Sequence, residues 1–272
     1  MMFLLTVAVL AQRAWADRAA NILGNMTLSE KIDLTHGHFA AGLYTGNTPA
    51  NERLGIPSIK LNDGPQGFRK SLGLLPINLI NASSQTAFPT GVTVAATWDV
   101  NLAFEWGSAL GEEFAGKGAN VQLGPGMNIA RVPECGRNFE VRATTRCLST
   151  QRPAQHSIDA SHSTAHSRLP LLALLLALAL ACMVWPQYLG EDPFLAGALV
   201  GPTVRGIQQH GVVANAKHFV ANNQEESRRS VNVNVDRRTL FEVYYPAFRA
   251  AVEAGVGSVM CSQVCVCVIC WP

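Results

Sequence analysis

The stretch GVVANAKHF, residues 211–219, decides the expected fold. Its first part is a short, mostly apolar run, and the run closes on a cation and an imidazole, Lys217 and His218. A buried strand of a parallel β/α barrel presents polar side chains at this carboxyl end. The stretch therefore predicts a barrel strand that delivers two polar groups to a pocket.

Two other segments repeat this design. Residues 58–62 (SIKLN) end on Asp63, and residues 120–123 (NVQL) are followed by Arg131 and Arg137. Together with the ammonium and the imidazole, these groups can bond directionally to the hydroxyls of a polyhydroxylated ligand in a pocket that excludes water. The alternative is that each is an ordinary polar residue at a strand end.

Composition limits the class of protein. The 272 residues are 48% hydrophobic and 15% charged, which suits one large α/β domain or two small ones with a sizeable core. The net charge is +2, and the scattered Lys and Arg form no basic stripe, so nucleic acid is not an expected partner. The seven cysteines are too unevenly spaced for a disulfide framework.

Alternating patterns predict parallel β/α units rather than an all-β fold. Asp99 and Asp236 suit the caps of two long helices, and residues 27–30 (TLSE) form a capping box. The expected helices span residues 17–34, 99–116, 193–209 and 236–255, and the expected strands span residues 58–62, 90–96, 120–123, 211–218, 231–235 and 257–262.

The N-terminus has the features of a targeting segment. Residues 3–10 are apolar and are followed by a small-x-small cleavage pattern, which predicts a secretory signal peptide over residues 1–16 and an extracellular protein. No Lys or Arg precedes the apolar run, so a plain hydrophobic helix is the alternative.

The β/α pattern fails over residues 141–187. A polar segment there precedes a Leu/Ala run, residues 171–185, which would form a helix of about fifteen residues and is shorter than the roughly 20 needed to span a bilayer. His162 and His166 have a helical i,i+4 spacing, but no carboxylate accompanies them, so a zinc site is not expected.

Several motifs together resemble a known family. In order along the chain, they are LNDGPQG (residues 61–67), LGPGMNIAR (123–131), GRNFE (136–140) and AKHF (216–219). They resemble the N-terminal barrel of the family 3 glycoside hydrolases, the β-glucosidase family. The resemblance covers roughly residues 19–140 and 188–262.

The resemblance implies a (β/α)8 barrel, of which about six β/α units are expected here. It also implies retaining hydrolysis of terminal β-D-glucosyl residues, with a β-glucoside or oligosaccharide as substrate. Asp63 would bind sugar hydroxyls, and Arg137, Lys217 and His218 would line the same subsite. Arg131 completes the set of candidate substrate-binding residues because it follows a strand end.

The two acids of the reaction are not expected in this chain. Retaining hydrolysis needs two carboxyl groups about 5–5.5 Å apart. The family's nucleophile is an Asp well beyond a Met-Cys-Ser-Tyr-Asn segment, whereas here residues 260–262 (MCS) are followed by Gln263, and the acid/base comes from a second domain. No catalytic residue is therefore assigned, and no cofactor is expected because the displacement uses carboxyl groups.

The resemblance also suggests which segments of this sequence do not belong to the family's domain. Deleting residues 141–187 joins Glu140 to Tyr188 in the family's register, so a translated intron is one explanation, and a real insertion with a membrane-seeking helix is the other. The expected divisions are a signal peptide (residues 1–16), two barrel segments (17–140 and 188–262), the insert (141–187) and an aberrant tail (263–272).

Three functions remain open from the sequence. The first is a β-glucosidase-type hydrolase by descent, with this chain inactive. The second is a non-catalytic sugar-binding protein, and the third is a membrane-associated interaction protein built around residues 171–185. Membrane association is not favoured, because the run is short for a span. The oligomeric state is not specified.

Overall fold

The computed structural model describes residues 16–35, 37, 44–69, 84–132, 136, 188–228, 230–262 and 265–269. Expectations for the signal peptide before residue 16, for Arg137, for the insert and for the histidines within it lie outside these ranges. No helix of the described ranges is long and apolar enough to cross a membrane.

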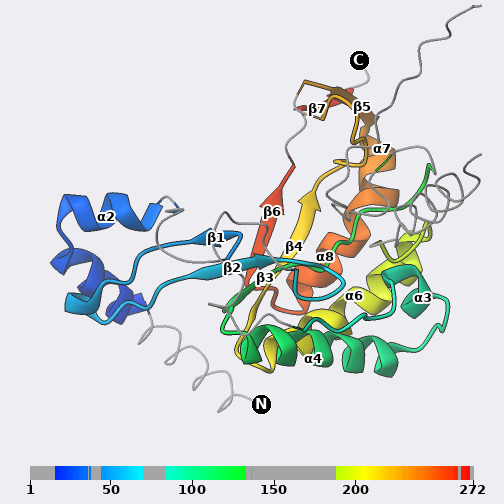
Figure 1. Ribbon diagram of the computed structural model, residues 1–272. Helices are drawn as coiled ribbons and strands as arrows, with labels where there is room; N and C mark the ends of the chain where they lie inside the picture. Colours follow the sequence, from blue (N-terminus) through cyan, green and yellow to red (C-terminus); the bar gives the residue numbers. More distant parts are fainter. Residues whose placement is uncertain are drawn as a thin grey trace, which may run out of the picture.

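One five-stranded sheet forms the centre of the structure, in the order β1-β2-β3-β4-β6 (Figure 1). The four strands from β2 to β6 run parallel, and β1 pairs antiparallel with β2 at one edge. A parallel sheet places all its carboxyl ends at one side, so the polar residues that end these strands are brought together. The strands of this sheet are β1 (Gly46–Asn47), β2 (Lys60–Asp63), β3 (Val121–Leu123), β4 (Val213–Phe219) and β6 (Ser258–Cys261).

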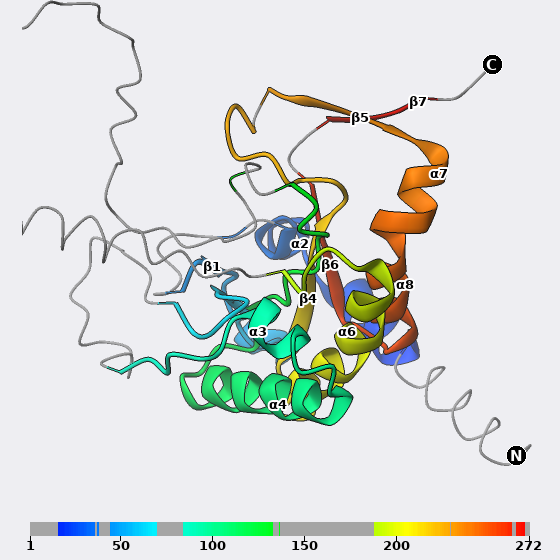
Figure 2. The ribbon, with the colours of Figure 1, turned by 90° about the vertical axis from the view of Figure 1, so that its right-hand side faces the viewer.

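Three long helices cover one side of the sheet. Helix α6 (Pro193–Gln208) lies between α4 (Val100–Gly116) and α8 (Tyr245–Glu253), as both views show (Figures 1 and 2). The expected caps are confirmed: Asp99 accepts hydrogen bonds from the first turn of α4, and Asp236 caps α7 (Arg237–Thr239), which leads through a π-helical turn, η5 (Leu240–Tyr244), into α8. These caps explain why the helices start where they do.

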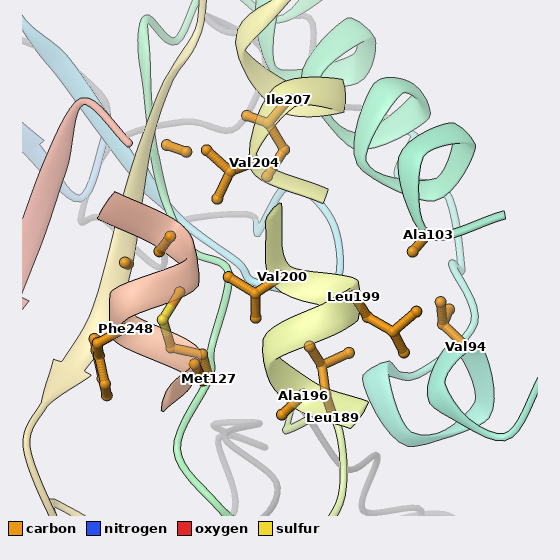
Figure 3. Packing of buried hydrophobic residues seen from close by; sticks show 14 of the residues in the cluster. Val94, Ala103, Met127, Leu189, Ala196, Leu199, Val200, Val204, Ile207 and Phe248 are labelled. Carbon is orange, nitrogen blue, oxygen red and sulfur yellow. The ribbon is translucent and has the colours of Figure 1, made fainter. Parts of the chain in front are cut away.

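The hydrophobic core lies between α6, its neighbouring helices and the sheet. Leu199, Val200 and Ile207 of α6 are fully buried. Leu199 points toward Ala103 of α4, and Val200 lies on the side of Met127 in the segment after β3 (Figure 3). The buried residues of α6 recur at spacings of three and four along the helix, at positions 196, 199, 200, 203, 204 and 207. This spacing places them along a broad face, which lets the helix bury residues against both of its neighbours.

The N-terminal helix is divided in two. Residues 16–25 form one helix and α2 (Leu28–Thr35) the next, on the opposite side of the sheet from α4, α6 and α8 (Figures 1 and 2). The predicted capping box begins α2: Thr27 N donates to Glu30 Oε2 over 2.8 Å, and Glu30 N donates to Thr27 Oγ1 over 3.3 Å.

Two of the expected barrel strands are wrong. Residues 90–96 contain a helix, α3 (Gly91–Ala95), because Thr90 caps it through a hydrogen bond from Thr93 N, and a short apolar run fits a buried helix as well as a strand. The strand β5 (Asn232–Asp236) forms, but it pairs in a separate sheet with β7 (Cys265–Ile269), within the tail that showed no pattern.

The barrel sheet of the described residues therefore contains four parallel strands rather than about six. It is an open half-barrel whose edges are β1 and β6. The general prediction of a mixed α/β fold with barrel-like β/α units is confirmed. The short 3₁₀ turn η2 (Glu52–Leu54) precedes β2 and completes the described elements.

Candidate functional site

Two predicted site residues meet at the carboxyl ends of the sheet. Lys217 Nζ of β4 lies 2.8 Å from Asp63 Oδ1 of β2, although the two residues are 154 positions apart in the sequence. The Lys217 side chain is 3% exposed and that of Asp63 is 21% exposed. The structure thus forms a largely buried ion pair in which the carboxylate is the more exposed partner.

A third residue, Arg69, completes this cluster, and the sequence analysis missed it. Its Nη1 lies 2.6 Å from Asp63 Oδ2, so both carboxylate oxygens are bonded to cations. Arg69 comes six residues after the strand and belongs to no strand end, so the strand-end rule could not find it. The Asp-Gly-Pro-x-Gly turn was the available signal, because such a turn reverses the chain toward its start.

The conformation of this turn explains how Arg69 returns. Gly64 has φ of +140°, and a side chain there would collide with the carbonyl group of Gly67. Arg69 N donates to Asp63 O over 3.0 Å, which closes the loop, and the buried Gln122 donates from Nε2 to Gly64 O over 3.1 Å. Glycine at position 64 is therefore required for the cluster.

The pKa of Asp63 is lowered from its ordinary value of 3.8. Burial is the largest single influence and would raise this pKa, but the charges of Lys217 and Arg69 and their hydrogen bonds together outweigh it. Asp63 is therefore an ionised hydrogen-bond acceptor at neutral pH, next to two cationic donors. Such a group is suited to binding hydroxyls.

The segment after β3 fixes the backbone of the Lys217–His218 corner. Lys217 N donates to Pro125 O over 3.1 Å, and Met127 N donates to Lys217 O over 2.9 Å. His218 is 5% exposed, and its N–H donates to Asn128 Oδ1 over 2.6 Å. The peptide bond between Lys217 and His218 is cis.

Arg131 lies in a different part of the described structure from this cluster. Arg131 is exposed and lines a cavity of about 360 Å³, whose other described lining residues are Val132, Ala221, Asn223, Gln224, Val233 and Tyr244. Arg137 lies outside the described residues, but its neighbour Gly136 pairs with Gln224 in an isolated antiparallel bridge. Gly136 therefore lies beside the segment that follows β4.

The described ranges hold no group of three or more His, Cys, Asp and Glu side chains arranged to hold a metal ion. The chemistry of the cluster is that of an ionic hydrogen-bonding site: one carboxylate that accepts, and two cations that donate.

The fold and the site define an α/β half-barrel with a polar cluster at the carboxyl ends of its strands. The family model described as "Glycosyl hydrolase family 3 N terminal domain" matches residues 187–269. A probable β-glucosidase A of Aspergillus terreus is 36% identical over 273 residues, covering 91% of this chain and 25% of the relative. The β-glucosidase A of Aspergillus kawachii is 35% identical and covers 92% of the chain.

Solved structures give the same result. The β-glucosidase DesR of Streptomyces venezuelae, in complex with D-glucose, matches with a TM-score of 0.68 and 31% identity over 92% of this chain and 25% of its own. β-Glucosidase 3B of Thermotoga neapolitana, in complex with glucose, matches with a TM-score of 0.68 and 32% identity over 92% of this chain and 30% of its own. These matches confirm the resemblance of the motifs to the N-terminal domain of glycosyl hydrolase family 3. The chain spans about a quarter of the length of the curated relatives.

Proposed function

We propose that this chain is the sugar-binding part of a β-glucosidase-type glycoside hydrolase. In this proposal the ligand is a terminal β-D-glucosyl residue of a β-glucoside or oligosaccharide. Asp63 accepts hydrogen bonds from its hydroxyls, and Lys217, His218 and Arg69 donate to its oxygens. Arg137 is a further proposed donor to the same sugar, and Arg131 contacts a more distant part of the ligand.

The contact between Lys217 and Asp63 carries this proposal. Desolvating a buried Lys–Asp pair with an additional Arg costs much of what their attraction contributes, so the net gain in stability is small. Stability alone therefore explains poorly why these three charges are placed together. The carboxylate has donors on both oxygens and keeps 21% of its side-chain surface exposed, which leaves room for a hydroxyl to approach. The relatives whose structures contain glucose support glucose as the ligand.

We infer that the chain as printed binds a sugar without cleaving it. Hydrolysis with retention uses a nucleophilic carboxylate and a second carboxyl group as acid/base. Asp63 is held in two ion pairs, which favours a binding role over attack on the anomeric carbon. Double displacement would then require two carboxyl groups other than that of Asp63.

We further propose that residues 141–187 and 263–272 come from unspliced sequence, that residues 1–16 are a signal peptide and that the product is secreted. The remaining residues, 17–140 and 188–262, then form the barrel segment. Sequencing the mature transcript tests the first of these points. A message that keeps the codons of residues 141–187, together with a protein of matching mass, would contradict it.

Hydrolysis of an aryl β-glucoside tests the function. The printed chain is compared with a version that lacks residues 141–187 and carries the C-terminal part of a family relative. We expect turnover in the extended version alone. Turnover by the printed chain would overturn the inference that Asp63 and its partners bind a sugar without cleaving it, and no turnover by a folded extended version would count against the hydrolase assignment.

A further inference from the structure

The Lys217–His218 corner is held by one side chain in particular, that of Asn128. Two hydrogen bonds to the backbone of Lys217 come from backbone groups of Pro125 and Met127, which most residue types could provide. Asn128 is 2% exposed, and its Oδ1 accepts from His218 N over 2.6 Å, which is short for an N–H···O hydrogen bond. This contact depends on the identity of residue 128.

A second asparagine fixes the first. Asn128 Nδ2 donates to Asn223 Oδ1 over 3.1 Å, and Asn223 Nδ2 donates to Ile129 O over 2.7 Å. The chain of bonds begins at a backbone N–H, that of His218, and ends at a backbone C=O, that of Ile129. Because both ends have a fixed polarity, neither amide can turn over without placing two donors or two acceptors against each other.

This relay joins two parts of the site. Asn128 follows β3, His218 ends β4, and Asn223 lies in the loop after β4, where it also lines the cavity that contains Arg131. Asn128 is buried and Asn223 is half-buried, and each amide both accepts and donates a hydrogen bond. A network of hydrogen-bonded amides gives a more rigid arrangement than one with unmatched groups. The orientation of Lys217 toward Asp63 is thereby tied to the loop that borders the cavity.

We propose that Asn128 and Asn223 are positioning residues, which hold the Lys217–His218 corner in the geometry that binds the sugar. The proposal rests on the sugar-binding function proposed above and extends it to two residues that contact the ligand only through others. Removing the acceptor on residue 128 deletes the short hydrogen bond from the N–H of His218 and lets the corner move. The sugar affinity of the variant then falls by more than its loss of folding stability accounts for.

The test compares four variants of the full chain with the unchanged chain, using D-glucose as the probe in calorimetry. Asn128→Ala removes the acceptor, Asn128→Asp keeps an acceptor for His218 N–H, and Asn223→Ala removes the support of Asn128. Thr203→Ala is the matched control, because Thr203 is a buried polar residue bonded to Leu199 O and Ala103 O within the helix layer.

We expect Asn128→Ala to weaken glucose binding about tenfold, Asn223→Ala to weaken it less, and Asn128→Asp to recover part of the loss. Thr203→Ala should lower the urea midpoint while the affinity of the folded fraction stays unchanged. Equal affinity in Asn128→Ala and the unchanged chain would overturn the proposal, and so would an equal loss of affinity in Asn128→Ala and Thr203→Ala. Asn223→Ala carries the comparison if Asn128→Ala does not fold.

The NMR resonance of the His218 amide proton tests the relay independently of the proposed sugar binding. A short hydrogen bond shifts this resonance downfield, so it should move upfield in Asn128→Ala and stay closer to its original position in Asn128→Asp. An unchanged resonance in Asn128→Ala overturns the relay even where glucose binds. Absence of glucose binding by the unchanged chain, with the resonance shifting as expected, contradicts the proposed function instead.

Discussion

Replacing Asp63 by Asn tests the ion pair at the centre of the site. The variant has nearly the same shape, but the ammonium group of Lys217, on a side chain that is 3% exposed, loses its negative partner. Two unit charges at 2.8 Å attract by about 6 kcal/mol with an effective dielectric constant of about 20, before desolvation is subtracted. Removing one partner of a fully buried pair costs about 3–5 kcal/mol.

The partial exposure of Asp63 lowers the free-energy cost that we expect for Asp63→Asn. Its side chain is 21% exposed, so we expect Asp63→Asn to reduce the free energy of unfolding by about 2–3 kcal/mol. Lys217→Met should cost less, about 1 kcal/mol, because Asp63 keeps its contact with Arg69 and its access to water.

Urea denaturation followed by circular dichroism measures both variants, provided that the transition is two-state. The order of the two costs is the decisive result. A larger cost for Lys217→Met than for Asp63→Asn would refute the reasoning that the ammonium is the more buried charge. Costs below about 0.5 kcal/mol for both variants would show that the pair is not formed in solution.

Further predictions concern pH, packing and capping. The pKa of Asp63 is lower in the folded chain than its ordinary value of 3.8. The carboxylate therefore contributes its full stabilisation above pH 3.8, and this contribution is lost as the pH falls through the lowered pKa. Unfolding curves between neutral pH and about pH 3 should show that the free energy of unfolding falls less with acid in Asp63→Asn than in the unchanged chain. Gly107→Ala should lower the free energy of unfolding by about 2 kcal/mol or more in thermal or urea unfolding, because the added Cβ would meet the backbone of Thr203. Gly116→Ala is the control: its Cβ would meet open space, so stability should change by less than about 1 kcal/mol. Equal effects of the two substitutions would argue against the close packing of α4 and α6. Asp99→Ala should lower the unfolding free energy by about 1 kcal/mol without changing glucose affinity, and an unchanged midpoint would contradict the capping role.

The sequence predicted the parts of the fold that local rules govern. Asp99 and Asp236 begin helices as expected, since a capping side chain acts within its own first turn. The meeting of Asp63 and Lys217 was also predictable, because parallel strands bring their carboxyl ends to the same side of a sheet.

The remaining features depend on non-local geometry. Residues 90–96 could be either strand or helix until the packing of α3 was known. Arg69 returns to Asp63 only because Gly64 adopts a positive φ, and the amide relay through Asn128 requires the segment after β3 to cross to the end of β4. The spacing of residues along the sequence predicts neither the contact between Arg69 and Asp63 nor the contact between Asn128 and His218.

Calorimetric titration with D-glucose tests the central claim most directly, on the full chain beside Asp63→Asn and the surface-capping control Asp99→Ala. The account predicts one binding event in the millimolar range, about −4 kcal/mol, for the unchanged chain and the control, and its loss in folded Asp63→Asn. Binding that is equal in all three, or absent from a folded unchanged chain, would contradict it.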